Sequence, residues 1–447
     1  MLTKIWRKIA LAGGALVLVG CAAVFPSTDA TIDWNAPQQV IDGFGASATG
    51  YVGGISSTRA DQWFSPDKGL GFSLLRIKLI PDTLDYDCGC VANNPHYACL
   101  TGPRSGIVTG DLEVAQLAAQ RGVRIIATPW SPPAEMKSSN KYCGGGQMLG
   151  TPQNYSRYAD TLASFPALLH AHNVPIDAIS IQNEPDFQSL YDTCLWTARQ
   201  FHEFVPYLFR ALQSAGYPHV AIAAPEQSQW SFDLAKETLS DPSSASDIGL
   251  LLGHAYHSEN ARDVPNIDHL HVWQSEVSDL GAFNGDMEDA LRWARSISDY
   301  MNAGANAWMY WNLECGTQQF NSPKNMCLTS QDGSLAKRAW VLGQFAKFIR
   351  PGWHRISVTS QGPLLITAYR GPSTQFAVVV VNSSRWFGQQ EKIRLAGFPA
   401  RPASVTPWVT TAHASLAAQK PVSVAEDNSI TWNIPRASVV TFVGNAS

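Results

Sequence analysis

Two glutamates, each near the end of a short apolar run, are the residues in this chain best placed for chemistry. Glu184 ends the run Ala178–Glu184, and Glu276 lies near the end of His271–Val277. A carboxyl at the end of a buried strand can be held still, partly desolvated and directed into a cleft. Two such carboxyls facing each other can break a glycosidic bond, because one donates a proton while the other acts as nucleophile or base. The alternative for either residue alone is a strand-end carboxylate that caps a neighbouring helix.

The apolar runs follow a pattern of alternating strands and helices. Eight runs end in polar residues: Val40–Ser47, Leu74–Ile80, Arg124–Trp130, Ala178–Glu184, Val220–Glu226, Gly249–Tyr256, His271–Val277 and Ala307–Asn312. Amphipathic stretches lie between most of them: Asp111–Arg121, Asn154–His172, Trp196–Ala215, Asp286–Asn302 and a shorter one at Ser231–Leu239. This alternation predicts an α/β fold, a (β/α)8 TIM barrel, in which catalytic side chains lie at the C-terminal ends of the strands. Glu184 then belongs to the fourth strand and Glu276 to the seventh.

The sequence changes character after Pro351, where short strand-like runs alternate with turn residues. These runs are Leu364–Tyr369, Phe376–Asn382, Lys392–Leu395, Ser404–Val409, Val422–Val424 and Ser438–Val443. They predict an antiparallel β-sandwich side domain over residues 351–447, attached to a barrel over residues 38–350. Residues 22–37 are expected to form a linker and an N-terminal strand that joins the side domain. This domain either braces the barrel, which we favour, or binds carbohydrate.

The N-terminus has the composition of a targeting segment. Three basic residues precede the apolar stretch Ile9–Val19, which is too short for a comfortable transmembrane helix. Residues 18–21, Leu-Val-Gly-Cys, resemble a bacterial lipobox, which assigns residues 1–21 to a signal peptide and makes Cys21 the candidate lipidation site. An ordinary signal peptide cleaved near Ala23 is the competing interpretation. Either way, the sequence predicts export, as a cell-envelope lipoprotein or a secreted protein.

Charge and cysteine content narrow the partners and the compartment. The net charge of −4 over 447 residues gives no strong attraction to nucleic acid or to an anionic membrane. Export permits disulfides, and the seven cysteines other than Cys21 are an odd number, so at least one should be free or paired between chains. The natural local pairs are Cys315 with Cys327, and Cys88 or Cys90 with Cys99. Their spacing does not suit a zinc site, so no metal is expected.

Five motifs give the chain a resemblance to glycoside hydrolase family 30. In chain order they are Ile41–Ser47 (IDGFGAS), Thr128–Pro133 (TPWSPP), Gln182–Pro185 (QNEP), Ser275-Glu276 and Gly343–Gly352 (GQFAKFIRPG). The likeness runs from residue 31 to the C-terminus. It implies a retaining O-glycosyl hydrolase without metal or organic cofactor, with Glu184 as acid/base and Glu276 as nucleophile. In such a mechanism the carboxyls lie roughly 5–5.5 Å apart, so the charge on one keeps the other protonated.

The resemblance also implies substrate-binding roles for neighbours of the two glutamates. Asn183 matches a residue that contacts the sugar 2-OH, and its alternative is a turn-forming asparagine. Arg76, inside a barrel strand, matches an arginine beside the nucleophile, and its alternative is a purely structural ion pair. His254 and Tyr256 match a His-x-Tyr motif whose tyrosine lies near the nucleophile, while His254 is equally well explained as a structural residue.

Three further side chains complete the expected site. Trp130 and Trp311 end the third and eighth runs, where their rings can form the walls of the subsite beside the scissile bond. Packing in the core is the alternative for both. Asp82 is a candidate contact to a sugar hydroxyl.

The resemblance implies a β-linked carbohydrate substrate, and we expect a monomer that acts in endo mode on xylan, β-1,6-glucan or β-1,6-galactan. Only a short stretch precedes the barrel, which favours this branch of the family. The family's glucuronoxylanases use an arginine after the eighth strand, and the absence of arginine between Trp311 and Lys337 puts a dependence on glucuronic acid in doubt. Insertions at Asp85–Arg104 and Lys141–Thr151 should reshape the groove. An exo-acting glucosylceramidase-type enzyme is the alternative, and a non-catalytic glycan-binding lipoprotein is a remote one.

Overall fold

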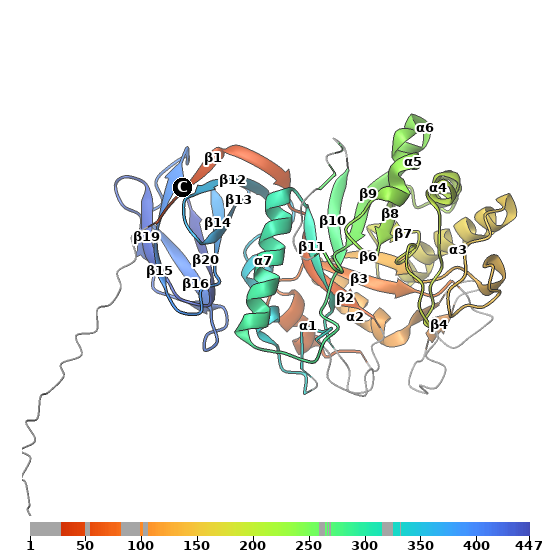
Figure 1. The fold of residues 1–447 in the computed structure, drawn as a ribbon, viewed down its shortest axis with the longest axis horizontal. Helices are drawn as coiled ribbons and strands as arrows, with labels where there is room; N and C mark the ends of the chain where they lie inside the picture. Colours follow the sequence, from red (N-terminus) through yellow and green to blue (C-terminus); the bar gives the residue numbers. More distant parts are fainter. Residues whose placement is uncertain are drawn as a thin grey trace, which may run out of the picture.

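Two parts lie side by side along the long axis of the protein, an α/β barrel and a β domain (Figure 1). The structure is a computed structural model, and it describes residues 28–49, 54–81, 99–101, 106–258, 264–265, 267, 270–314, 325–330 and 332–447. The predicted fold class, a (β/α)8 barrel with a β side domain, is confirmed.

Within the described residues, eight parallel strands close the barrel in the order β10-β11-β2-β3-β6-β7-β8-β9. They are β2 (Gly43–Ala48), β3 (Leu74–Leu79), β6 (Arg124–Pro129), β7 (Ala178–Ser180), β8 (Ala221–Gln227), β9 (Ile248–His254), β10 (His271–Glu276) and β11 (Ala307–Asn312). Outside the barrel, β4 (Cys99–Thr101) and β5 (Gly106–Val108) form a small antiparallel pair. Each predicted apolar run overlaps one barrel strand, to within one residue at the strand ends that lie outside the runs, but β7 is much shorter than its run.

Strand β7 ends at Ser180, well before Glu184. The backbone leaves the sheet because its groups find other partners: the Asn183 N–H donates to the Pro129 carbonyl at 2.8 Å, and the Glu184 N–H donates to the Glu226 carbonyl at 3.0 Å. Glu184 has a φ of 45°, in the left-handed region that residues with side chains adopt uncommonly. The prediction that strand four extends to Glu184 was wrong, and the turn that replaces it brings Asn183 and Glu184 into the same buried cluster, where they contact Arg76 and His254.

Helices cover the outside of the barrel. They are α1 (Ser57–Phe64), α2 (Thr109–Ala119), α3 (Pro152–Ala171), α4 (Ala198–Ser214), α5 (Lys236–Ser240), α6 (Pro242–Ala245), α7 (Met287–Ala303) and α8 (Lys337–Ala346), with 3₁₀ turns at Ala134–Met136 and Asp233–Ala235. A capping box between Thr197 and Gln200 starts α4, and Asp286 caps α7, which ends at Gly304 with a φ of 109°. The helix expected at Ser231–Leu239 is a 3₁₀ turn followed by α5. Among these described helices, none is both long and apolar enough to cross a membrane.

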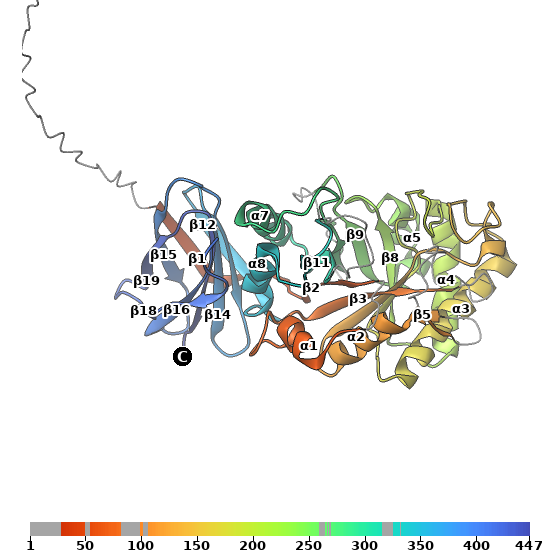
Figure 2. The ribbon, with the colours of Figure 1, turned by 90° about the horizontal axis from the view of Figure 1, so that it is seen from below.

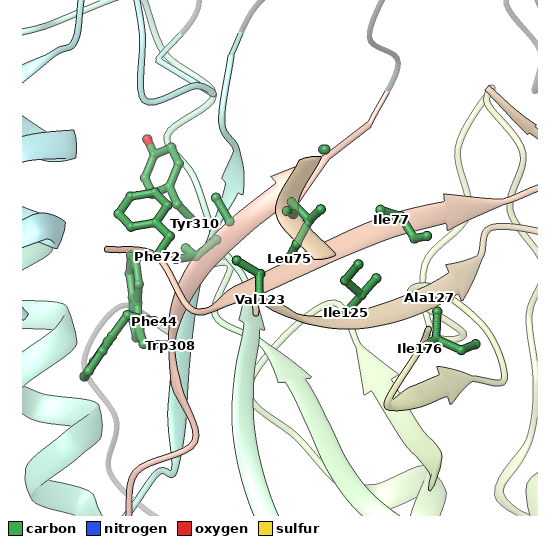
Figure 3. Close-up of a cluster of buried hydrophobic side chains, with 14 of the residues drawn as sticks. Phe44, Phe72, Leu75, Ile77, Val123, Ile125, Ala127, Ile176, Trp308 and Tyr310 are labelled. Carbon is green, nitrogen blue, oxygen red and sulfur yellow. The ribbon is translucent and has the colours of Figure 1, made fainter. Parts of the chain in front are cut away.

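Alternating side chains divide each barrel strand between two apolar layers. Leu75 and Ile77 of β3 point outward, into the layer between strands and helices (Figure 3). Leu74 belongs to the inner layer, which also contains Ile126, Ala178, Ala223, Leu250, Leu252, Trp273, Ala307 and Met309. This period of two brings Arg76 to the interior of the barrel.

The β domain is built from one continuous curled sheet rather than two separate ones. Its order in the described chain is β17-β16-β20-β14-β13-β12-β1-β15-β19, with β18 paired to β16. The strands are β1 (Thr28–Val40), β12 (His354–Ser360), β13 (Leu365–Arg370), β14 (Gln375–Asn382), β15 (Gln389–Ala396), β16 (Ser404–Thr410), β17 (Ala417–Ala418), β18 (Val422–Ser423), β19 (Ser429–Ile434) and β20 (Ser438–Asn445). The N-terminal strand β1 joins this sheet as expected, antiparallel to β12 but parallel to β15, so the sheet is not purely antiparallel.

Helices α7 and α8 lie between the barrel and the β domain (Figure 2). Gln344 of α8 is fully buried, and its side-chain amide donates to Thr410 Oγ1 at 2.8 Å. Thr441 in turn donates to the Gln344 carbonyl at 2.9 Å. Where the chain passes between the barrel and the β domain, the Ile41 N–H donates to the Trp353 carbonyl at 2.7 Å. These contacts fix the β domain against the outside of the barrel.

Candidate active site

The guanidinium of Arg76 joins three side chains that reach the barrel interior from β8, from β10 and from the turn after β7. Its Nη1 donates to Glu276 Oε2 at 2.7 Å, its Nε to Glu226 Oε1 at 2.8 Å, and its Nη2 to Asn183 Oδ1 at 2.6 Å. Burial alone would lower the pKa of Arg76, but the charges of Glu226 and Glu276 raise it above its ordinary value. Arg76 is therefore a permanent buried cation that fixes the positions of these three groups.

The Glu276 carboxyl, at the end of β10, receives a hydrogen bond on each oxygen. Arg76 donates to Oε2, and the Tyr256 hydroxyl donates to Oε1 at 2.9 Å. Burial raises the pKa of Glu276 above its ordinary value, while the charges of His254 and Arg76 act in the opposite direction. Both hydrogen-bond donors favour the ionised carboxyl, so this environment suits a carboxylate that attacks.

Glu184 lies beside Glu276 and takes different partners. Its Oε1 is 3.1 Å from His254 Nδ1, and its Oε2 accepts a hydrogen bond from the Tyr191 hydroxyl at 3.0 Å. One oxygen of Glu184 and one of Glu276 lie within 4.8 Å of each other, and a ring nitrogen of His254 is within the same distance of both. The turn after β7 thus brings the two predicted carboxyls together at the end of the barrel.

His254 is a second buried cation in this cluster. Burial lowers its pKa, but the charge of Glu276 and the contacts with Glu184 and Glu226 raise it to about 10. At neutral pH the ring is therefore an imidazolium. Its Nε2 lies 3.7 Å from both Glu226 Oε1 and Glu276 Oε2. Two cations, His254 and Arg76, thus face three carboxyls, which leaves one carboxyl able to hold a proton without an excess of positive charge.

Glu226 is one residue of this cluster that sequence reasoning missed, and Tyr191 is another. Glu226 is fully buried near the end of β8, and it binds Arg76 and accepts a hydrogen bond from Thr128 Oγ1 at 3.2 Å. Burial raises the pKa of Glu226, but Arg76 and His254 outweigh burial and lower it, so Glu226 remains ionised. The signal was available, because Glu226 ends the fifth apolar run just as Glu184 ends the fourth.

The two predicted tryptophans meet beside Arg76. The rings of Trp130 and Trp311 are 5.9 Å apart between centroids and inclined by 48°. The Arg76 guanidinium carbon lies 4.6 Å from the Trp130 ring centre and 6.0 Å from that of Trp311. The structure therefore brings both rings, Asn183, His254 and Tyr256 to the two glutamates. Asp82 lies outside the described residues.

Glu184, His254 and Glu276 also have a spacing that a metal ion could use. The charges of the site oppose that use. A protonated His254 has no lone pair free for a metal, and the Arg76 guanidinium bound to Glu276 repels a cation. The cluster is better suited to acid–base and nucleophilic chemistry by its own side chains.

Comparison with known proteins agrees with a carbohydrate-cleaving barrel. Residues 107–319 match the glycosyl hydrolase family 30 TIM-barrel domain. The glucuronoxylanase XynC of Bacillus subtilis (strain 168) is 25% identical over 443 residues, covering 95% of this chain and 94% of that protein. Putative glucosylceramidase 3 of Caenorhabditis elegans is 23% identical over 387 residues, covering 76% of this chain and 72% of that protein.

A solved structure gives the same result. The glycoside hydrolase family 30 subfamily 8 xylanase Xyn30A from Clostridium acetobutylicum superposes with a TM-score of 0.78 at 28% identity, covering 94% of this chain and 100% of that one. The fold and these relatives define a glycosyl hydrolase. The match over residues 107–319 and these relatives make the chain similar to the enzymes of glycoside hydrolase family 30.

Proposed function

We propose that the chain is a retaining β-glycoside hydrolase in which Glu276 is the nucleophile and Glu184 the acid/base. The observation that carries this proposal is the short separation of the two carboxyls, which bring one oxygen each within 4.8 Å. Retaining enzymes hold their carboxyls roughly 5–5.5 Å apart, whereas inverting enzymes leave roughly 6.5–9.5 Å for a water molecule. Both side chains are almost fully buried, which suits a site that excludes bulk water.

The reaction would run in two displacements. In the first, the Glu276 carboxylate attacks the anomeric carbon while Glu184 gives its proton to the departing glycosidic oxygen, leaving a glycosyl ester on Glu276. In the second, Glu184 takes a proton from water, whose oxygen attacks the anomeric carbon and releases Glu276 as a carboxylate. Asn183, held by Arg76 at 2.6 Å, is the proposed donor to the sugar 2-OH.

Xylan is the proposed substrate, cleaved within the chain. Support comes from the xylanases described above, which match this chain over nearly its full length. Uronic-acid branches are not required in this proposal, because no arginine occurs between Trp311 and Lys337. Trp130 and Trp311 would form the wall beside the scissile bond.

The test is digestion of glucuronoxylan, unbranched xylan, β-1,6-glucan and β-1,6-galactan, with products read by mass and anomeric NMR. A ladder of oligosaccharides from both xylans, first formed in the β configuration and absent with Glu184→Gln, is the expected result. First products in the α configuration would overturn the retaining mechanism. A ladder from β-1,6-glucan or β-1,6-galactan alone would replace xylan as the substrate.

The alternative function is an exo-acting β-glycosidase of the glucosylceramidase type. It is favoured by the similarity to the nematode putative glucosylceramidase over 76% of this chain. Turnover of glucosylceramide or a simple aryl β-glucoside, without oligosaccharide ladders from any polymer, would establish it. A non-catalytic glycan-binding protein would show neither reaction, although the retained Glu184, Glu276 and Arg76 argue against it.

We further propose export with a lipid on Cys21, on the basis of the basic and apolar segments that precede Leu-Val-Gly-Cys. The intact mass of the protein recovered from its native source tests this. Cleavage before Cys21 with added acyl mass supports the anchor, and cleavage near Ala23 supports a secreted enzyme. An intact N-terminus would refute both.

A further inference from the structure

Tyr191 contacts the proposed acid/base from the side opposite His254. Its hydroxyl donates to Glu184 Oε2 at 3.0 Å, while His254 Nδ1 lies 3.1 Å from Oε1. Burial and the Glu184 charge hold the pKa of Tyr191 well above its ordinary value, so the hydroxyl keeps its proton. Tyr191 is 38% exposed whereas His254 is fully buried, which places Tyr191 on the open side of the carboxyl.

Backbone pairing holds the segment that carries Tyr191. The Gly144 N–H donates to the Tyr191 carbonyl at 3.0 Å, and the Leu195 N–H donates to the Gly146 carbonyl at 2.8 Å. The Met148 N–H returns a bond to the Leu195 carbonyl at 3.0 Å. The segment after Glu184 is therefore docked on residues 144–148, which belong to the insertion Lys141–Thr151 that was expected to reshape the groove.

An ion pair then ties the same segment to the barrel. Lys78 Nζ lies 2.7 Å from Asp192 Oδ2 and 3.0 Å from Oδ1, and both side chains are nearly buried. Lys78 follows Arg76 by two residues on β3, so both side chains point to the same face of the strand. The Lys78 ammonium also lies 5.1 Å from the Trp130 ring centre. Tyr191 is thus fixed in two ways, through its own backbone carbonyl and through the side chain of the next residue, Asp192.

We propose that Tyr191 is a positioning residue for Glu184, and that the segment 185–195 forms the wall against which the leaving-group sugar lies. This inference rests on the proposed function, because it assumes that Glu184 is the acid/base. The acid must stand beside the leaving-group oxygen, so the surface that continues outward from Glu184 Oε2 borders the leaving group. Large apolar side chains are exposed on this segment, Phe187 and Leu190, and on the insertion that holds it, Leu149. The C–H face of a pyranose ring can pack on such side chains.

The Tyr191 hydroxyl would act in both displacements. When Glu184 is ionised, Tyr191 donates to Oε2 and holds the carboxylate in the orientation that accepts a proton from water. When Glu184 is protonated, the Tyr191 oxygen can accept a hydrogen bond from the Glu184 hydroxyl until the glycosidic oxygen takes its place. Without the hydroxyl, the acid loses orientation, and its ionised form loses one hydrogen bond.

The variant Tyr191→Phe tests this role, through the dependence of its kcat/KM on the leaving group of the substrate. Cleavage of a phenyl β-xylobioside requires protonation of the leaving oxygen, whereas a 2,4-dinitrophenyl leaving group departs with little protonation. We expect kcat/KM for the phenyl glycoside to fall about tenfold, the worth of one hydrogen bond to a charged group, with little change for the dinitrophenyl glycoside. An equal fall on both substrates, or no fall on either, would overturn the positioning role.

The pH profile supplies a second readout that a merely structural role would not move. Loss of a donor to the ionised acid should shift the alkaline limb of kcat/KM to higher pH by on the order of one unit. Tyr217→Phe, which removes a hydroxyl remote from the cluster, is the matched control and should leave the limb in place. Asp192→Asn, which weakens the tie to Lys78, should reproduce the leaving-group dependence of Tyr191→Phe in smaller degree. An unmoved alkaline limb in Tyr191→Phe would count against the hydrogen bond to Glu184.

Failure of this inference can be separated from failure of the proposed function. If Glu184→Gln lowers kcat/KM for the phenyl glycoside but spares kcat/KM for the dinitrophenyl one, Glu184 is the acid, and a Tyr191→Phe without that pattern refutes only the inference. If Glu184→Gln shows no such dependence, the assignment of the acid is wrong and the inference falls with it. For the wall, Leu190→Ser should raise KM for xylan while leaving KM for the dinitrophenyl glycoside unchanged. Unchanged xylan kinetics would refute that part.

Discussion

Arg76 Nη1 lies 2.7 Å from Glu276 Oε2, and neither side chain is more than slightly exposed. Such a pair is costly to form, because both charges leave water, and it stabilises the protein only when further hydrogen bonds satisfy both groups. Here Arg76 has two more partners, Glu226 and Asn183, and Glu276 has Tyr256. The pair thus holds the Glu276 carboxyl in one orientation, as the proposed nucleophile requires, and this role would explain why a strand inside an apolar barrel carries an arginine.

Glu276→Ala should lose activity by roughly 10⁴- to 10⁶-fold, the scale on which removal of a covalent nucleophile acts. The cavity left by the carboxylate can admit azide, which would attack from the same side and release a glycosyl azide in the α configuration. Recovery of turnover with azide, using a dinitrophenyl β-glycoside and NMR of the product, is the measurement. Glu135→Ala, at a surface site, is the control. Full activity of Glu276→Ala would contradict the mechanism.

Glu226→Gln should destabilise the protein by about 3 kcal/mol, because it leaves the buried Arg76 with one negative partner fewer. The matched control is Glu135→Gln, which breaks an exposed pair with Arg157 at 2.7 Å and should change stability by less than about 1 kcal/mol. Chemical unfolding of both variants measures the difference. We also expect Glu226→Gln to lower kcat, since Arg76 orients Glu276. Equal stability losses in the two variants would show that Glu226 is not a structural anion of the site.

Cys194 should be unreactive in the folded protein. It is a free and fully buried thiol, and burial raises its pKa to about 12, against a smaller opposing effect of Lys137. At pH 8 almost no thiolate forms, and the sulfur cannot be reached by a reagent. Peptide mapping after alkylation should find the Cys194 peptide unmodified in native protein and modified after unfolding. Labelling of native protein at this peptide would contradict the burial.

The sequence predicted those parts of the site that depend on strand ends. Glu276 ends a strand whose apolar run is continuous, so periodicity and the rule that chemistry lies at strand ends were enough to single it out. The role expected for Arg76, in the middle of β3, came from the resemblance to family 30. Glu184 was placed on the wrong element, since it lies in the turn after β7 and not in the strand. The run that contains it continues past Ser180, whereas hydrogen bonds from Asn183 and Glu184 to neighbouring strands end the ladder there. These partners are distant in the sequence, so the pattern of apolar residues in the run itself could not show where the strand ends.

Other features escaped because their signals were weak or non-local. Glu226 ended an apolar run, but a single glutamate gives no sign of its partner 150 residues earlier, Arg76. Strand β12, His354–Ser360, is polar and half exposed, so it lacks the alternation that marks a strand. Its pairing with β1 fixes it, and that contact joins segments that are far apart in the sequence, such as Ala30 and Ser360. The Tyr191 contact with Glu184 depends likewise on how a loop docks on residues 144–148.

The charge of His254 predicts a specific pH dependence of stability. Its pKa rises from 6.5 in the unfolded chain to about 10 in the fold, so the folded state holds a proton that the unfolded state has lost between these values. The stabilisation from the charged ring is therefore complete below pH 6.5 and is lost as the pH rises through 10. We expect the unfolding free energy of the wild type, relative to His254→Gln, to fall between pH 7 and 9 with a slope of at most about 1.4 kcal/mol per pH unit. Urea unfolding of both proteins across this range measures it, and His170→Gln, at an exposed histidine of α3, should show no such slope. A difference that stays constant or grows with pH would mean that His254 is neutral in the fold. His254 would then not count among the cations that face the three carboxyls.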